Sequence, residues 1–386
     1  MMKKSASKQS IIAIDASRSN TYGSKRFIKT ILDGLNKNTK LKVLLFVTSE
    51  NFDSYESSSV NIVRLNIGQA GFISILNATV VIPIKAYFSG ASLLYSPWDI
   101  GPIISPIPFI LGIHSPNSVT PKKYKSQKIP WLHEKLTRIS AAKAIGVEFP
   151  SYTAANEIGQ HMGIDPNKRK VIHHGAELSK WKDISKELEE SNSENEFGVP
   201  YFISWSWFYR AKNIETLIIA FHLFINDQNE KEQESNECKL ILAGKFYSDK
   251  YQREVLDLIN SLKLSERIEF IEQPSDKELV KLIYHSRAMV IPSLYETFGF
   301  MYVEGRIMDK PFIVADTEVA REVTESQCIY FKGLNSKDLA SKLKEVKIND
   351  KKQKMDYKIS KTFYEESARQ SLAEYFSSFF VTNEQN

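Results

Sequence analysis

Residues 201–224 read YFISWSWFYRAKNIETLIIAFHLF, and this stretch decides the fold class of the chain. The apolar run at 201–206 has the length and composition of a buried strand. A polar loop with Arg210 and Lys212 follows, and apolar residues then recur at three- and four-residue spacing over 214–224, which predicts a helix. A strand, a loop and a helix in this order belong to the βαβ unit of a parallel sheet covered on both faces.

The same order continues through the second half of the chain. Further strands are predicted at 239–243, 268–271, 288–291, 312–315 and 328–331, with helices at 250–262, 276–285, 300–308 and 336–346. Six strands with helices between them indicate a doubly wound α/β domain. The tail over 355–380 also has a helical pattern.

The first half shows the same rhythm less clearly. Helical patterns cover 27–35 and 153–162, and strands are predicted at 11–14, 41–47, 60–65, 93–96, 109–114, 144–148 and 170–172. An acid-rich run at 186–196 with almost no apolar residue indicates a linker or a surface insertion near the domain boundary. The sequence therefore predicts two Rossmann-like doubly wound domains that face each other across a cleft, with ligands at the carboxyl ends of the strands.

The composition excludes several classes of protein. With 42% hydrophobic and 25% charged residues among 386, the chain is expected to fold into domains. A net charge of +5 does not by itself indicate nucleic-acid binding, and two cysteines are too few for a disulfide framework. The apolar stretch 72–90 is interrupted by Asn77, Pro83 and Lys85, so we expect no membrane span and a cytoplasmic protein.

The strongest local signal is PSLYETFGF at 292–300. A strand ends at Pro292, a turn carries Glu296 and Gly299, and a helix begins beyond it. N–H groups at the start of that helix would favour an anion, and carboxylates at Glu296 and Glu304 suit sugar or ribose hydroxyls. The spacing alone also fits a helix cap followed by a surface glutamate.

Three cations are candidates for binding a diphosphate. Arg210 and Lys212 lie in a loop between a strand and a helix, and Lys245 follows the next strand. A lysine supplies a point charge and an arginine a fork of donors, although a solvated basic loop has the same composition. The chain contains no Asp-x-Asp pair, and its histidines lack zinc-ligand spacing with cysteine, so we expect no metal cofactor.

Several motifs together resemble the retaining glycosyltransferases of family four, which have the GT-B fold. The Glu-x7-Glu motif of that family is matched by Glu296 and Glu304 within 292–304. Residues 206–213 resemble its phosphate loop, 242–245 its next strand end, and 173–177 the histidine-glycine segment that closes its N-domain. The resemblance covers nearly the whole chain and is strongest after residue 141. It implies an acceptor-binding domain at 1–180, rejoined by a C-terminal helix at 364–386, and a nucleotide-sugar-binding domain at 198–363.

The resemblance also implies roles for individual residues. Glu304 would bind the ribose, Lys212 and Arg210 the diphosphate, and Glu296 the hydroxyls of the donor sugar. Backbone N–H groups near Phe298, Gly299 and Phe300 would bind the distal phosphate, and Lys245 is a weaker third cation.

Two candidates lie in the first half. His114 follows an apolar strand, at the position of a family histidine that contacts the transferred sugar, although Ser115 replaces the usual aspartate after it. Gly23 is the one glycine in the loop 15–27, which resembles the family's first loop for donor phosphate or acceptor; a plain turn is an equal interpretation.

The positive charge is concentrated in one segment. Between Lys122 and Lys143 there are seven basic residues and one acidic residue, so this segment carries a charge of about +6. A basic face beside Trp131 suits the anionic inner face of a membrane, and a solvated helix face is the alternative. No nucleic-acid recognition motif is apparent.

Together with the resemblance, these observations predict a hexosyltransferase that uses a GDP- or UDP-linked sugar and a lipid-linked saccharide acceptor, as in O-antigen or capsule assembly. Two other interpretations stay open. One is a nucleotide-sugar epimerase or hydrolase on the same architecture. The other is a non-catalytic nucleotide-sugar-binding subunit. The segment 306–310 (RIMDK) favours this alternative, because the family usually has small residues and a glycine there.

Overall fold

The computed structural model describes residues 10–36, 41–56, 60–65, 71–124, 130–227, 237–346 and 355–381. The chain forms two compact units. Unit 1 comprises Met1–Val119, Gln127–Gly175 and Lys361–Asn386, and unit 2 comprises Thr120–Ser126 and Ala176–Ser360.

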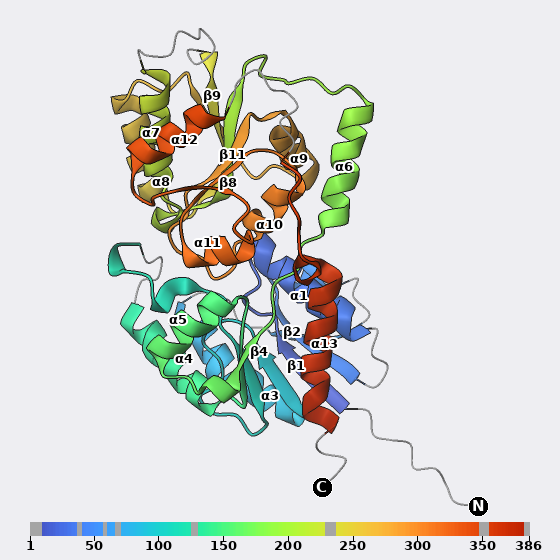
Figure 1. The fold of residues 1–386 in the computed structure, drawn as a ribbon. Helices are drawn as coiled ribbons and strands as arrows, with labels where there is room; N and C mark the ends of the chain where they lie inside the picture. The colour runs from blue at the N-terminus through green and yellow to red at the C-terminus, as the bar shows by residue number, and fades with distance from the viewer. Residues whose placement is uncertain are drawn as a thin grey trace, which may run out of the picture. The chain divides into compact units, whose positions relative to one another are not determined.

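Unit 1 is built on a parallel sheet of seven strands in the order β3-β2-β1-β4-β5-β6-β7 (Figure 1). Most of these strands are short apolar runs buried on both faces, as parallel sheets require. The strands are β1 (Ser10–Asp15), β2 (Leu41–Thr48), β3 (Asn61–Leu65), β4 (Leu93–Ser96), β5 (Phe109–Gly112), β6 (Gly146–Phe149) and β7 (Arg169–Val171).

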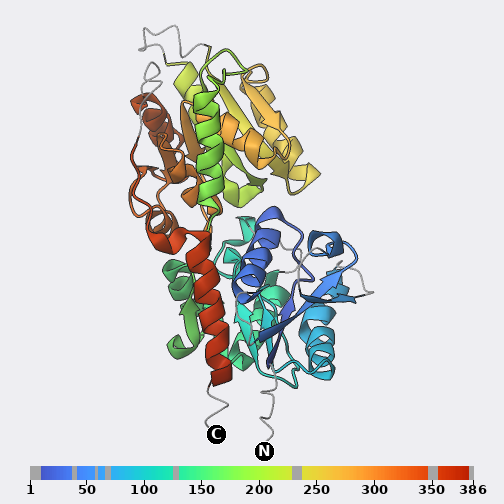
Figure 2. The same ribbon diagram turned by 90° about the vertical axis from the view of Figure 1, so that its right-hand side faces the viewer.

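Helices cover both faces of this sheet (Figure 2). Side chains alternate along β1, so Ile12 and Ile14 join the core with α1 (Tyr22–Asn36) and α13 (Glu365–Val381). Ala13 points to the other face, whose core includes residues of α3 (Ile82–Phe88), α4 (Pro130–Lys143) and α5 (Tyr152–Met162). The last helix of the chain, α13, thus packs beside the first, α1.

The apolar stretch that the sequence predicts to be interrupted is one continuous helical run. α2 (Gly71–Leu76) passes through a π-turn (Asn77–Val81) into α3. Pro83 cannot donate to the carbonyl of Thr79, which instead accepts the N–H groups of Ile103 and Ile104 at 3.0 and 3.3 Å. The run Gly71–Phe88 has 18 residues, a mean hydropathy of 1.5 and 33% of its length buried, so length and composition would allow it to cross a membrane.

Unit 2 contains a parallel six-stranded sheet in the order β10-β9-β8-β11-β12-β13. Counted within the unit this is the order 3-2-1-4-5-6 of a dinucleotide-binding fold. The prediction of two doubly wound α/β domains is confirmed. The strands are β8 (Tyr201–Phe208), β9 (Lys239–Phe246), β10 (Ile268–Ile271), β11 (Ala288–Ile291), β12 (Phe312–Ala315) and β13 (Ile329–Phe331).

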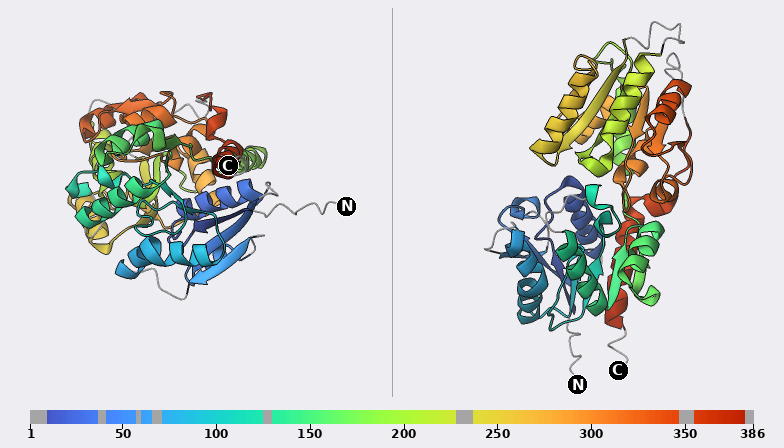
Figure 3. Two further views of the ribbon diagram at one scale, coloured as in Figure 1. Left: turned by 90° about the horizontal axis from the view of Figure 1, so that it is seen from below. Right: turned by 90° about the vertical axis from the view of Figure 1, so that its left-hand side faces the viewer.

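Both faces of the second sheet are also covered (Figure 3). One core joins the sheet to α7 (Ile214–Ile225), α8 (Asp249–Ser261) and α12 (Ser336–Glu345). On the other face Trp205 stacks on Phe312, and Phe312 lies against Gly305 of α10 (Phe300–Ile307). The unit also contains α9 (Asp276–His285) and α11 (Glu318–Val323).

Part of the acid-rich stretch is helical. α6 (Leu178–Glu190) packs along α9, with Leu178, Trp181 and Leu188 buried. Lys180 adds an ion pair with Asp276 at 2.5 Å. The four apolar residues of this helix, at 178, 181, 184 and 188, recur at three- and four-residue spacing, a helical signal that the acid-rich composition obscured.

Candidate functional site

In unit 2, strand order reverses between β8 and β11, and the loops after these two strands meet there. A 3-10 turn at Arg210–Lys212 follows β8. The N–H of Leu294 donates to the carbonyl of Ala211 at 2.9 Å, and the Asn213 amide donates to the carbonyl of Pro292 at 3.1 Å. These bonds fix the loop after β8 against the loop that carries Glu296.

The center of this site is an ion pair between Lys212 and Glu296. The Lys212 ammonium donates a short hydrogen bond to Glu296 Oε1, and the two side chains are only 9% and 11% exposed. Burial alone would lower the pKa of Lys212, but the Glu296 carboxylate and the Tyr209 hydroxyl raise it above its ordinary value. Lys212 is therefore a cation throughout the neutral pH range.

Two tyrosines that sequence reasoning missed flank this ion pair. Lys212 Nζ lies 5.4 Å from the ring center of Tyr209, and burial raises the pKa of Tyr209. Burial, followed by the charge of Glu296, raises the pKa of Tyr302 well above its ordinary value. Both phenols are neutral hydroxyls near the ion pair. The position of Tyr209 immediately before Arg210 was the signal available for the first of them.

The other half of the motif begins α10. Gly299 is its N-cap with φ of 75°, and a Cβ there would lie 2.8 Å from the Tyr302 ring, so both backbone and space favour glycine. Phe298 is buried and packs edge-on against Phe300 at 5.6 Å. Glu304 lies within α10 and is buried. The motif thus supplies one carboxylate from the loop and one from the helix.

The other two predicted cations have acidic partners elsewhere. The Arg210 guanidinium contacts Glu254 on α8, lies 3.8 Å from Glu215 on α7, and is about half exposed. Lys245 Nζ lies 3.8 Å from Glu272. Lys212 alone of the three predicted cations contacts Glu296, and diphosphate roles for the other two stay predictions.

In unit 1, His114 lies just beyond β5 in a cluster of rings. Its ring center is 4.6 Å from that of Phe27 and 4.8 Å from that of His174, and Phe27 is 4.5 Å from His174. Burial, followed by the charges of His114, His173 and Arg26, lowers the pKa of His174 well below its ordinary value. His174 is therefore neutral at physiological pH, whereas His114 has a carboxylate partner, Glu148, at 2.6 Å.

Gly23 lies in the first turn of α1, although the sequence suggests that the loop extends to residue 24. The helix starts earlier because Thr21 and Ser24 cap it reciprocally. The N–H of Thr21 donates to the Ser24 hydroxyl at 2.9 Å, and the N–H of Ser24 donates to the Thr21 hydroxyl at 3.2 Å.

The basic segment 122–143 is divided between the two units. Lys122 and Lys123 lie in unit 2, whereas α4 with its exposed Lys135, Arg138 and Lys143 belongs to unit 1. Lys125 and Lys128 lie outside the described residues. The segment is therefore not one helical face.

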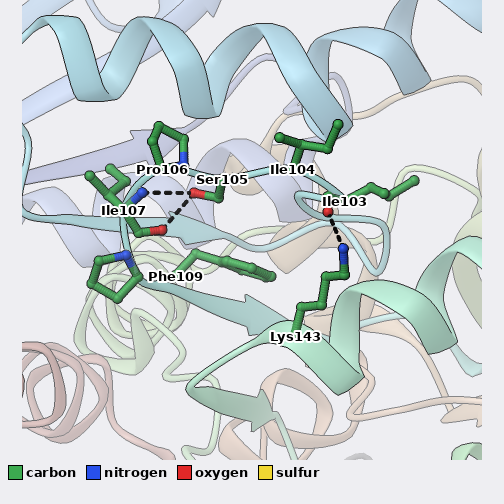
Figure 4. Close-up of a pocket in the computed structure, with 8 residues that line it drawn as sticks. Ile103, Ile104, Ser105, Pro106, Ile107, Phe109 and Lys143 are labelled. Carbon is green, nitrogen blue, oxygen red and sulfur yellow. Dashed lines mark hydrogen bonds between the residues drawn. The ribbon is translucent and has the colours of Figure 1, made fainter.

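A shallow pocket of about 480 Å³ lies at the end of α4 in unit 1 (Figure 4). Apolar side chains of residues 103–109 line it, and Lys143 donates to the carbonyl of Ile103 at 2.7 Å across its edge. Within the described part of the chain, no group of three or more His, Cys, Asp or Glu residues could hold a metal ion.

Residues 185–362, nearly all within unit 2, match the family model described as glycosyl transferases group 1. This segment is therefore similar to the group 1 glycosyltransferases, and the match covers just under half of the chain. The chain is 27% identical over 212 residues to the O-antigen chain mannosyltransferase RfbU of Salmonella typhimurium, and 24% identical over 165 residues to D-inositol 3-phosphate glycosyltransferase of Rhodococcus jostii. These alignments cover 55% and 42% of this chain but only 53% and 35% of the two relatives.

Solved structures match the fold of the whole chain. HepE of Anabaena, in complex with UDP-glucose, has a TM-score of 0.71 at 18% identity, covering 95% of this chain and 99% of that one. Sucrose-phosphate synthase of Thermosynechococcus elongatus has a TM-score of 0.71 at 15% identity, covering 97% and 100%. The α/β fold with sheets of seven and six strands is the GT-B fold.

Proposed function

We propose that the protein is a retaining glycosyltransferase that moves a hexose from a nucleotide-diphosphate sugar to a saccharide acceptor. The observation that carries this proposal is the Lys212–Glu296 ion pair at the point where strand order reverses, directly before the N-terminus of α10. A donor sugar needs hydroxyl acceptors, and its diphosphate needs a cation and N–H donors. The loop after β8 supplies the cation, and the loop after β11 with the start of α10 supplies the carboxylate and the N–H donors.

The main chemical task in this reaction is to stabilise negative charge on the departing diphosphate. In our proposal Lys212 and the N-terminal N–H groups of α10 take that role, so that no metal cofactor is needed. Glu296 accepts hydrogen bonds from the donor sugar once Lys212 turns to the diphosphate, and Glu304 accepts them from the ribose. His114 contacts the transferred sugar.

The relatives support our proposals for the donor and the acceptor. RfbU is named as an O-antigen chain mannosyltransferase, which favours a GDP-linked hexose, whereas the HepE structures hold UDP or UDP-glucose. We propose a GDP-linked donor with a UDP-linked one as the alternative, and a lipid-linked saccharide acceptor in surface polysaccharide assembly.

A thermal-shift screen of nucleoside diphosphates and their sugars tests the donor proposal. A ligand present at about 100 times its Kd adds roughly 2.7 kcal/mol to the free energy of unfolding, which raises Tm by several degrees. We expect ligands that carry one of the two bases to give such a shift. No change in Tm with any GDP- or UDP-linked ligand would contradict the proposal. Acceptor-free turnover of the stabilising donor would favour an epimerase or hydrolase, and binding without turnover would favour a non-catalytic subunit.

We also propose that unit 1 contacts the anionic inner face of a membrane from the cytoplasm. Its helical run Gly71–Phe88 exposes large apolar side chains, with Phe72 at 74% and Phe88 at 81% exposure, and its one charged residue is Lys85. Ile104, also exposed, lies on the loop that bonds to Thr79 of this run, and Lys143 borders the pocket under that loop. An apolar surface edged by lysines suits anionic lipid.

Replacing Phe72 and Phe88 together by aspartate should weaken sedimentation with vesicles of anionic phosphatidylglycerol at least roughly tenfold. The variant lacks two aromatic rings that would be buried in the lipid, and its two added negative charges are repelled by the anionic headgroups. Tyr247→Asp, which changes an exposed aromatic residue of unit 2, is the matched control and should bind as the wild type does. Equal binding by the wild type to neutral phosphatidylcholine vesicles would contradict the electrostatic part of the proposal.

A further inference from the structure

Unit 1 contains a carboxylate that the proposed function does not use. Glu148 lies in β6, in the interior of the seven-stranded sheet, and is 0% exposed. Glutamate is almost never fully buried without a partner, because desolvating an ionised carboxylate costs several kcal/mol. A position of this kind has to be maintained by specific contacts.

Two side chains from neighbouring strands meet this carboxylate. Glu148 Oε2 accepts a hydrogen bond from the Tyr95 hydroxyl at 2.8 Å and lies 2.6 Å from His114 Nε2. Tyr95 belongs to β4, and its side chain reaches Glu148 across β5, where Gly112 pairs with Glu148. A Cβ on Gly112 would lie 2.8 Å from the Tyr95 hydroxyl and 3.0 Å from His114 Nε2. Glycine at 112 therefore leaves the space in which the three polar groups meet.

The C-terminal helix closes this cluster. The Phe376 ring of α13 lies 4.8 Å from the Tyr95 ring, and a Cβ on Gly146 would collide with the Tyr375 hydroxyl. Burial, followed by the Glu148 charge, raises the pKa of both Tyr95 and Tyr375. Both phenols therefore keep their protons, and Tyr95 is a donor to Glu148 at every physiological pH.

The geometry points to Glu148 as a positioning residue for His114. A carboxylate 2.6 Å from Nε2 requires a proton on that nitrogen. Glu148 thereby fixes the orientation of the ring and its Nε2–H tautomer, in which Nδ1 is the acceptor nitrogen. His114 then presents an acceptor for a sugar hydroxyl. This inference rests on the proposed function, in which His114 contacts the transferred sugar.

Transfer kinetics of Glu148→Gln test the inference. The amide is isosteric but no longer requires a proton on Nε2, so we expect kcat to fall roughly 10- to 100-fold, by analogy with the outer partners of metal-bound histidines. The KM for the donor should change less than about twofold, because donor binding is assigned to residues of unit 2. Glu148→Asp, which keeps the charge, should recover part of the activity. Tyr95→Phe removes the other hydrogen bond to the same carboxylate and should keep most of kcat.

A double-mutant cycle separates positioning from general structural support. The variant with both His114→Ala and Glu148→Gln should be no slower than His114→Ala alone, because Glu148 acts only through the imidazole. Additive losses would overturn the inference. So would a Tyr95→Phe variant that loses as much kcat as Glu148→Gln.

Imidazole 15N shifts of His114 in the ligand-free wild type provide a readout that needs neither activity nor a stable variant. We expect the Nε2–H tautomer, in which Nδ1 is the acceptor nitrogen. The Nδ1–H tautomer would overturn the inference even if transfer is observed. The expected tautomer together with no transfer from any donor would instead overturn the proposed function and leave the Glu148–His114 pairing established.

Discussion

Lys212→Met is expected to lower the rate of transfer by roughly 10²- to 10³-fold, with little change in the KM for the acceptor. Removing one preorganised donor from developing anionic charge in a shielded site costs about 2.7–4 kcal/mol of transition-state stabilisation. Lys212 is buried beside Glu296, so water cannot readily replace its charge. The measurement is kcat with saturating donor and acceptor, and a loss confined to KM would contradict the assignment.

Arg210→Met is the matched control for this prediction. Arg210 lies in the same 3-10 turn but is about half exposed and paired with Glu254 and Glu215. Exposed pairs of this kind contribute little, so kcat should change less than roughly tenfold. If the two variants were equally slow, the distinction between these cations would be wrong.

Stability has to be checked alongside the rate. Lys212→Met leaves the Glu296 carboxylate without its cation in a site that is 11% exposed, and breaking such a pair can cost a few kcal/mol. Adding Glu296→Gln to Lys212→Met should restore most of the lost Tm without restoring transfer. Recovery of both would mean that the single variant was inactive because it unfolded.

Fold was predictable from sequence wherever a short apolar run ends in a turn. The bounds of β10, β11, β12 and α9 coincide with the predicted ranges. β11 and β12 are fully buried apolar runs, β10 is a short, mostly apolar run, and α9 has a regular helical stripe. The helices α4 and α6 were missed. The acid-rich composition obscured the apolar spacing of α6, and the pattern within α4 mixes charged and apolar side chains. In the run Gly71–Phe88, Pro83 was interpreted as a break because the N–H groups of residues 103 and 104, which satisfy the Thr79 carbonyl, are distant in sequence.

The candidate site was predictable in its loops but not in its pairings. The spacing places Glu296 in a loop and Glu304 in a helix, and the structure has them there. The contact of Lys212 with Glu296 depends on the order of strands in the sheet, which brings residues 84 positions apart together. The diversion of Arg210 to Glu254 depends on the placement of α8. Glu148 looks like one polar residue in a short strand, and only the register with Gly112 shows what it faces.

Glu304→Gln should weaken donor binding roughly 10- to 100-fold while kcat at saturating donor changes less than about threefold. A buried carboxylate that accepts ribose hydroxyls contributes about 1.5–3 kcal/mol for each charged hydrogen bond, and the amide keeps the volume but loses the charge. The ribose is remote from the reacting carbon, so its hydrogen bonds stabilise the bound donor and the transition state equally. Their loss therefore raises Kd and KM for the donor and leaves kcat little changed. Titration calorimetry with the nucleoside diphosphate measures it directly.

Glu296→Gln is expected to have the opposite effect to Glu304→Gln, on kcat more than on binding. Glu296 contacts Lys212 and is assigned to the donor sugar, so its replacement should lower kcat more than it weakens binding of the nucleoside diphosphate, which lacks the sugar. The two glutamates would then contact different parts of the bound donor, Glu304 the nucleoside and Glu296 the sugar. Unchanged affinity of the Glu304→Gln variant for the nucleoside diphosphate would contradict the role of Glu304. A Glu296→Gln variant that loses only affinity for the nucleoside diphosphate, with kcat unchanged, would contradict the role of Glu296. Because both residues belong to unit 2 and to one loop-and-helix motif, the contrast between them depends only on which part of the donor each contacts.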